Sequence, residues 1–334
     1  MATTSHARVA TAGVGAPTSG TGINTVHTTA GEKEDFSDII GLIAPYDTPC
    51  YSTFRKVDAI APVVHWQEDE LAAASATAIV EGADVGDDAD VSSPGISINY
   101  TQLFEKTAKV SSTADATQWH GRSSEIDYQV MKRGREIKRN IEFAMVGVTN
   151  VAVPGDLTTA REMASADQLI TPTKALAITT NLVESDVLTV QQEVYEAGGD
   201  PNWLLVTPAT SAVVANFAYI DPTNGSVASA RSREIENGNK LVNIVEIYQS
   251  PYGTMTVVTD KFLMGAVGAG GDGTGSTALL LETDRWAIPV LQPIQVEDLA
   301  KVGHSDRKLV SCESSLLHEN TNASGSITNI DTNV

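Results

Sequence analysis

The segment from Ser123 to Thr149 has the longest unbroken helical period in the sequence, and it constrains the fold more than any other feature. Its apolar residues are three, four or seven positions apart, which places them in one stripe along a helix. These residues are Ile126, Val130, Ile137, Ile141, Met145 and Val148. Ser124 followed by Asp127 has the pattern of a capping box, and Glu125 adds an acid near the positive end of the helix. The pattern predicts one long helix over 123–149 that serves as a strut.

The polar face of this predicted helix is basic. Its cations are Lys132, Arg133, Arg135, Lys138 and Arg139. The whole chain has 22 Lys and Arg against 42 Asp and Glu, a net charge of −20. A basic cluster in such a chain either meets acidic surfaces of neighbouring chains or faces a polyanion. The alternative is a solvated helix face with intrahelical pairs such as Glu136 with Arg139.

A long acidic segment lies between two predicted strands, 61–66 and 96–104, the second of which alternates apolar and polar residues. The segment has eight acids and no base, and it is too long for a hairpin turn and too polar for a core. It is either a disordered acidic loop or a projecting flap that finds its partners on another chain. The acids that we treat as candidate subunit-interface residues are Glu68, Asp69, Glu70, Glu81, Asp84, Asp87 and Asp88. Its Asp87–Asp90 cluster could hold a divalent cation, but solvated charge is commoner.

The second half of the chain reads as a compact α/β unit followed by strands. Ser185 is expected to cap a helix that ends at Gly198, followed by a buried strand at 203–207 and a second helix from Pro208. The polar stretch 221–240 carries two further candidate interface residues, Arg231 and Arg233. A hairpin around Pro251 and strands from about 278 complete the unit. Residues 1–31 are poor in large apolar groups, and the last residues resemble them in composition.

Composition excludes several classes of protein. The 334 residues contain enough apolar side chains, 42%, for a sizeable core, but no apolar stretch of transmembrane or signal-peptide type. Cys50 and Cys312 are far apart and belong to no CxxC pair, so two buried free thiols are expected. The acidic balance argues against a protein that coats nucleic acid.

The sequence offers no catalytic constellation. The Gly-rich stretch 268–275 has no lysine after it, so it reads as a flexible turn and not as a phosphate loop. The six histidines show no HxxxH or HxH spacing, and no GxSxG motif occurs. We therefore expect no enzyme, no cofactor and no metal site.

The order of these features and several blocks of sequence resemble the major capsid proteins of tailed double-stranded DNA bacteriophages, which have the α+β Hong Kong 97-type fold. The blocks are TFRKVDAIAPVVHWQEDEL, VEGAD, ISINYTQLFEKTAKVSSTADA, GRSSEIDYQVMKRGREIKRNIE and HSDRKLVSCESSLLHENTNASGSI. The resemblance covers most of residues 34–330. No single motif within it is chemically diagnostic.

The resemblance implies a division of the chain. Residues 1–56 would form an N-terminal arm along neighbouring subunits, and 57–112 an extended loop, a β-hairpin lying over the adjacent subunit. Residues 113–175 and 278–334 would form a peripheral domain with the helix 123–149 as its spine. Residues 176–277 would form an axial α/β domain whose loop 221–240 points toward a five- or six-fold axis.

The resemblance also implies partners and location. The chain would assemble with itself into pentamers and hexamers of an icosahedral head shell, with a portal and with possible scaffold or decoration proteins. It would enclose double-stranded DNA without sequence-specific binding, would not bind membranes, and would assemble in the host cytoplasm to become part of the virion. No lysine occurs between Gln67 and Tyr100, so we expect no lysine-based cross-link from the loop. No scaffold-like helical segment precedes the arm, so a scaffold would be encoded elsewhere or absent.

Opposite charges suggest one contact between subunits: the acidic segment, Glu68 to Asp90, would dock on the basic face, Lys132 to Arg139, of a neighbour. Two other functions remain open at this point. One is the shell of an encapsulin-like nanocompartment, which has the same fold. The other is an acidic virion-associated enzyme or binding module, against which stand the missing catalytic motifs and an aromatic content of 5%.

Overall fold

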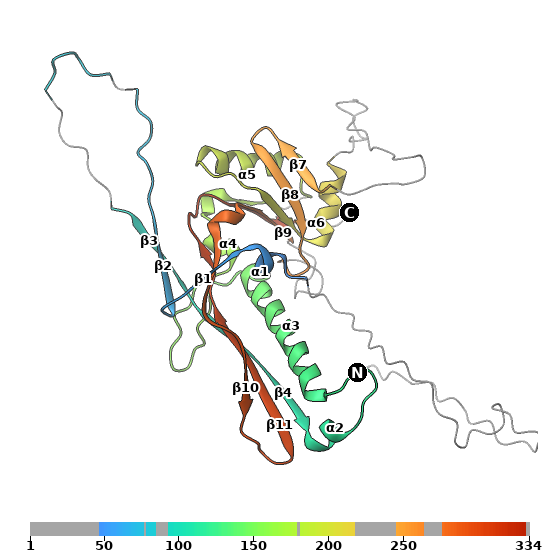
Figure 1. Ribbon diagram of the computed structural model, residues 1–334. Helices are drawn as coiled ribbons and strands as arrows, with labels where there is room; N and C mark the ends of the chain where they lie inside the picture. The colour runs from blue at the N-terminus through green and yellow to red at the C-terminus, as the bar shows by residue number, and fades with distance from the viewer. Residues whose placement is uncertain are drawn as a thin grey trace, which may run out of the picture.

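The computed structural model of the chain describes residues 47–76, 78–84, 93–178, 181–217, 245–263 and 276–331. They form two larger sheets with helices packed against them and a separate two-stranded hairpin (Figure 1). The short helices are α1 (Pro49–Thr53), α2 (Ser112–Ala116), α4 (Ala166–Leu169) and the 3-10 helices η1 (Pro172–Lys174) and η3 (Thr283–Arg285). No helix among the described residues has the length and apolar character that a membrane span requires.

The first sheet has the strand order β1-β10-β11-β4, and the short strand β12 pairs with β10. Its strands are β1 (Arg55–Asp58), β4 (Gln102–Ser111), β10 (Trp286–Leu299), β11 (Ser305–Ser314) and β12 (Leu317–His318). Only β1 runs parallel to its partner, β10. The β10–β11 register shifts between Val290 and Gln295, where Pro293 cannot donate a ladder hydrogen bond.

The long helix α3 (Glu125–Val146) lies across this sheet, against β4 and β11 (Figure 1). The predicted helix therefore exists, three residues shorter at its C-terminal end. Ser124 caps it by accepting the N–H of Asp127, as the capping pattern predicted. Ile137, Ile141 and Met145 of the predicted stripe are fully buried. Their burial against the sheet stabilises the helix more than its intrinsic propensity does.

The second sheet has the order β5-β13-β9-β6-β8-β7. Its strands are β5 (Ala175–Ala177), β6 (Trp203–Val206), β7 (Ile247–Ser250), β8 (Gly253–Thr259), β9 (Ser276–Leu281) and β13 (Gly325–Ile330). Helices α5 (Glu184–Glu196) and α6 (Pro208–Asn216) pack against it. The two helices, the strand after α5 and the β7–β8 hairpin confirm the α/β unit predicted from the sequence.

The two faces of the second sheet contribute to different cores, because side chains alternate along a strand. In β6, Leu204 and Val206 join the core beneath α5, whereas Leu205 joins the core that contains Ile141 and Met145 of α3. Residues of β9 divide in the same way. One face of the second sheet therefore contributes to the same core as the C-terminal half of α3.

The start of α5 differs from the prediction. The N-cap is Val183 and not Ser185, which lies inside the helix. The Asp186 carboxylate accepts the backbone N–H of Val183, so an acid in the first turn does the capping from within the helix. The predicted C-terminal glycine is confirmed, since Gly198 has a φ of 92° after the last turn.

The hairpin consists of β2 (Val63–Glu68) and β3 (Gly95–Tyr100), which pair antiparallel along their full length. The sequence predicted one strand over 96–104, but the chain leaves the hairpin at Thr101 and continues into the first sheet as β4. Thr101 is fully buried, and its N–H is donated to the Pro62 carbonyl oxygen. A continuous alternating pattern in the sequence conceals this change of sheet, because only Thr101 separates β3 from β4.

The sheet pairings show where three boundaries of the predicted division fall in the fold, and the division itself stays a prediction. Cys50 and Phe54, which the predicted arm 1–56 included, are buried in the chain's own core, and β1 belongs to the first sheet. Strand β4 also belongs to the first sheet and not to a projecting loop. The boundary at 277/278 cuts through β9, and β13, from a tail that resembled the N-terminal arm, lies between β5 and β9 in the second sheet.

Candidate subunit interface

The five basic residues of α3 differ in exposure and in their partners, although the sequence places them on one face. Arg133 donates to Glu136 at 2.6 Å, and the guanidinium of Arg139 lies over the Phe262 ring, 5.4 Å from its centroid. The predicted pair Glu136–Arg139 is therefore wrong: Glu136 pairs one turn in the other direction. Lys132 is half-buried, whereas Arg135 and Lys138 are exposed. These last two offer positive charge to another molecule.

A cavity of about 370 Å³ lies beside Lys138, between α1, β1, α3 and the β10–β11 pair. Its lining residues are Tyr51, Lys56, Lys138, Val290, Pro293, Ile294, Cys312 and Ser314. The Lys56 ammonium lies 4.2 Å from the centre of the Tyr51 ring, a cation–π contact. An apolar pocket with two lysines suits an apolar side chain that has a carboxylate next to it.

At the loop end of the hairpin, where Glu68 pairs with Gly95, two of the predicted acids have partners within their own chain. Glu68 accepts hydrogen bonds from Trp66 Nε1 at 2.7 Å and from Thr321 Oγ1 at 2.8 Å. Partial burial opposes its ionisation, but the hydrogen bonds from Thr321, Ser97 and Trp66 outweigh burial and lower the pKa of Glu68. Glu70 accepts from Asn322 Nδ2 at 2.7 Å. These two acids tie the hairpin to the segment before β13.

Three residues that the sequence did not single out fix the other end of the hairpin, its base, where Val63 pairs with Tyr100. The buried Asn99 accepts the N–H of Ala164 at 2.8 Å and donates to the Leu316 carbonyl oxygen at 2.7 Å. Arg161 forms an ion pair with Glu313 and donates to the Thr101 carbonyl oxygen at 2.6 Å. A polar residue at the inward side of a strand is a weak sequence signal, since it does not reveal its partners.

Beyond Glu70, the described residues of the segment between β2 and β3 are exposed to solvent. Leu71, Ile79 and Val80 are 98%, 84% and 78% exposed. Asp69, Glu81 and Asp84 are exposed around them. Figure 1 shows this loop reaching away from both sheets. Large apolar side chains with so little cover indicate a surface that another molecule buries.

The remaining candidate residues, Asp87, Asp88, Arg231 and Arg233, lie outside the described residues, as do the predicted arm before residue 47 and the loop 221–240.

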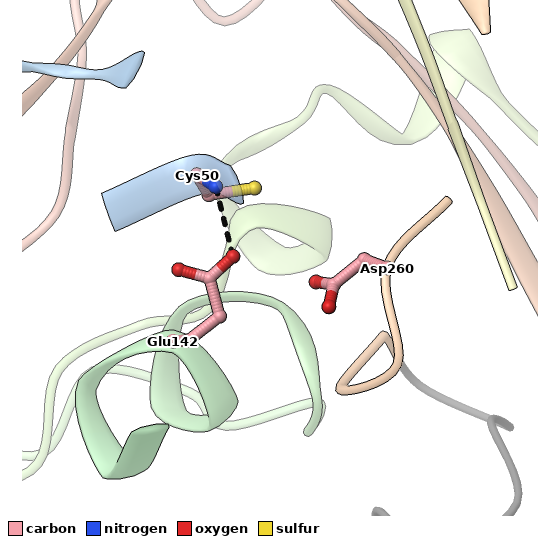
Figure 2. Close-up of side chains that lie close together, drawn as sticks. All are labelled: Cys50, Glu142 and Asp260. Carbon is pink, nitrogen blue, oxygen red and sulfur yellow. Dashed lines mark hydrogen bonds between the residues drawn. The ribbon is translucent and has the colours of Figure 1, made fainter. Parts of the chain in front are cut away.

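A cluster that the sequence did not predict lies under α1, where Cys50, Glu142 and Asp260 meet (Figure 2). Burial, and then the charge of Asp260, raise the pKa of Glu142 to about 8, and burial raises the pKa of Asp260 to about 6. Burial also raises the pKa of the Cys50 thiol. Both cysteines are free and buried, as predicted. The three residues come from distant parts of the chain, so no sequence spacing could reveal the cluster.

Comparisons with known proteins give the family of the chain. Residues 18–331 match the family model of the SU10 major capsid protein. The chain is 26% identical to the major capsid protein of Escherichia phage Phieco32 over 345 residues, which cover 88% of this chain and 93% of the relative.

Solved structures resemble the fold at low sequence identity. A structure from Gordonia phage Cozz has a TM-score of 0.59 at 13% identity, with coverage of 94% of this chain and 97% of the other. The holo-SrpI encapsulin complex from Synechococcus elongatus PCC 7942 has a TM-score of 0.54 at 10% identity, with coverage of 88% and 94%.

The α+β Hong Kong 97-type fold is thus common to phage capsids and an encapsulin, and the fold alone does not separate the two kinds of shell. The family match does, since it spans almost the whole chain. The chain belongs to the SU10 major capsid protein family: it is a structural protein of the virion, not an enzyme, and it forms the head shell of a tailed phage.

Proposed function

We propose that the subunits form pentamers and hexamers in which each chain lays the loop between β2 and β3 over its neighbour. The observation that carries this proposal is the high solvent exposure of Leu71, Ile79 and Val80. These side chains lie on a loop that hydrogen bonds of Glu68 and Glu70 anchor to the rest of the subunit. Burying three such side chains stabilises a contact by several kcal/mol, at roughly 1.5–3 kcal/mol each. The same contact repeated around a closed ring and across a shell makes the whole assembly stable.

The neighbour's surface that suits this loop lies beside α3. The cavity next to Lys138 has apolar walls, and Arg135 and Lys138 supply exposed positive charge. The loop supplies the complement, because Ile79 and Val80 are followed directly by Glu81. We therefore propose that Ile79 or Val80 enters the cavity of the adjacent subunit while Glu81 faces Lys138.

The sheet membership of the strands suggests a role for each part of the chain. We propose that the first sheet with α3 is the peripheral domain and that the second sheet, now including 276–281 and 325–330, is the axial domain. The arm would then be the residues before 47, and the extended loop would be the hairpin with its acidic segment. These assignments rest on the family resemblance together with the sheet membership of each strand.

The shell would enclose double-stranded DNA without sequence-specific contacts. A chain with a net charge of −20 offers few cations to release counterions from phosphate, so packaged DNA would stay mobile against it. A portal and scaffold or decoration proteins stay proposed partners that rest on the resemblance alone.

The loop proposal is tested with Leu71→Ser, Ile79→Ser and Val80→Ser combined in one chain. We expect normal folding, because these side chains have little burial in the subunit, and loss of rings and shells in light scattering and electron microscopy. Leu157→Ser is the matched control, since Leu157 is fully exposed in a different loop. Shells of normal size and yield from the triple variant would refute the proposed contact.

A further inference from the structure

The buried cluster of Cys50, Glu142 and Asp260 joins three parts of the fold. Cys50 lies in α1, Glu142 in the last turns of α3, and Asp260 directly after β8 (Figure 2). One ligand-type atom from each, the Cys50 sulfur and one carboxylate oxygen from each acid, lies within 4.8 Å of the other two. All three residues are at most 1% exposed.

The cluster has no compensating positive charge within the described residues. No ion pair formed by these residues includes Glu142 or Asp260. The nearest cations along the chain are turned to other groups: Lys261 pairs with Asp47 at 3.0 Å, and Arg139 lies over the Phe262 ring. Two buried carboxyl groups without a counter-charge are costly unless a proton or a metal cation joins them.

Hydrogen bonds orient the two carboxylates as the outer shell of a metal site does. The two Glu142 oxygens accept the backbone N–H groups of Cys50 at 2.8 Å and Tyr51 at 2.7 Å. Asp260 Oδ1 accepts the N–H of Phe262 at 2.8 Å. Asp260 Oδ2 is buried and has no hydrogen-bond partner among the described residues, and Figure 2 shows the carboxylate directed toward Glu142. This oxygen is therefore free to coordinate a cation.

We propose that Cys50, Glu142 and Asp260 form a binding site for one divalent transition-metal ion of the zinc type. A thiolate ligand favours zinc over magnesium or calcium, which prefer oxygen alone. Zinc accepts sulfur and carboxylate oxygen at ~2.0–2.3 Å, so the three atoms need to draw together by roughly 1 Å. Three protein ligands leave one tetrahedral position for a water molecule.

Binding requires proton release. The Cys50 thiol, and Glu142 where it is protonated, give their protons to solvent as the sulfur and oxygen lone pairs bond to the metal, with no change of oxidation state. The bound ion would connect α1 to α3 and α3 to the turn after β8. Because only the folded chain brings these segments together, the ion should stabilise the fold.

The test uses the purified full chain, freed of metal by a chelator and then titrated with Zn²⁺ or Co²⁺. We expect one metal ion per chain, a rise of the unfolding temperature by several degrees with Zn²⁺, and an intense near-ultraviolet sulfur-to-cobalt absorption with Co²⁺. Cys50→Ser should abolish that absorption and Asp260→Asn should weaken metal binding at least tenfold. Cys312→Ser, which removes the other buried thiol, is the control and should retain all three signals.

The cobalt absorption keeps the test decisive even if an Asp260 variant folds poorly, since it is measured on the unchanged chain. Less than one-tenth of a metal ion per chain after titration, or an equal zinc response of the unchanged chain and Cys50→Ser, would overturn the proposal. The two carboxyl groups would then be held together by a shared proton.

Discussion

The rings of Trp286 and His318 stack face to face in the core, with 4.0 Å between their centroids and 10° between their planes. Ser324 joins the two: its Oγ accepts from Trp286 Nε1 at 3.0 Å and lies 3.1 Å from His318 Nε2. The other imidazole nitrogen, Nδ1, lies 3.4 Å from the Leu169 carbonyl oxygen. A neutral imidazole with its proton on Nδ1 satisfies all these groups at once.

His318 makes a contribution to stability that we expect to be lost in mild acid. Burial, the main cause, lowers the pKa of His318 to about 4 from 6.5. Between these values the unfolded chain binds the proton at His318 more readily than the folded chain, so the contribution of His318 to the free energy of unfolding falls as pH falls from about 6.5 to about 4. The difference corresponds to roughly 3 kcal/mol.

The measurement is denaturant unfolding of the chain at several pH values, compared with His318→Gln. The variant should be less stable at pH 7, and its difference from the unchanged chain should shrink as pH falls from 6.5 to 4. The raised pKa values of Glu142 and Asp260 act with the opposite sign and equally in both chains, so this difference isolates His318. The exposed His304 provides the control His304→Gln. An identical slope in the unchanged chain and His318→Gln would contradict the prediction.

A change of glycine to alanine should have opposite effects on stability at two positions of α3, its C-cap Gly147 and Gly134 within the helix. A Cβ at Gly147, the C-cap, would lie 2.5 Å from the Phe262 carbonyl oxygen, so Gly147→Ala should cost about 1–3 kcal/mol. A Cβ at Gly134 would meet nothing within 4 Å, so Gly134→Ala should stabilise the helix by about 0.5–1 kcal/mol. Thermal unfolding of both variants checks this. Equal shifts of the same sign would disprove the packing argument.

We expect the hydrogen bonds of Asn99 to stabilise the base of the hairpin against local unfolding. Asn99→Ala leaves the Ala164 N–H and the Leu316 carbonyl oxygen buried without their partner, which should cost about 2–4 kcal/mol. Amide hydrogen exchange in β2 and β3 should become faster before the rest of the chain is affected. The exposed Asn140 of α3 gives the control Asn140→Ala, expected within about 0.5 kcal/mol of the unchanged chain. Unaltered exchange in the hairpin would show that Asn99 does not fix it.

The proposed charge pairing between subunits predicts rescue by a charge swap. Arg135→Glu with Lys138→Glu should weaken assembly, most strongly at low salt where screening is least. Adding Glu81→Lys and Asp84→Lys to the same chain restores attraction between neighbours and should recover shells. The measurement is the yield of shell-sized particles of each variant in light scattering. Normal assembly of the first double variant, or no recovery in the quadruple variant, would rule out this pairing.

Local pattern was sufficient for the parts of the fold that local chemistry controls. The stripe of Ile137, Ile141 and Met145, with Ser124 as the cap, predicted α3 to within three residues at either end. The alternation around Ile98 predicted strand β3, and the glycine after α5 predicted its end. In each case the residues that decide the structure are neighbours along a helix or strand, so the sequence displays them together.

The sequence by itself determined the long helix, the two strands of the hairpin and the resemblance to phage major capsid proteins. Only the tertiary structure decided that β13 enters the second sheet, that Glu68 and Glu70 bind their own chain, and that Cys50 meets Glu142 and Asp260. Each depends on a contact between residues far apart in the chain. Such contacts are set by which strand edges, cavities and donors remain free once the rest has packed, and no local pattern records that.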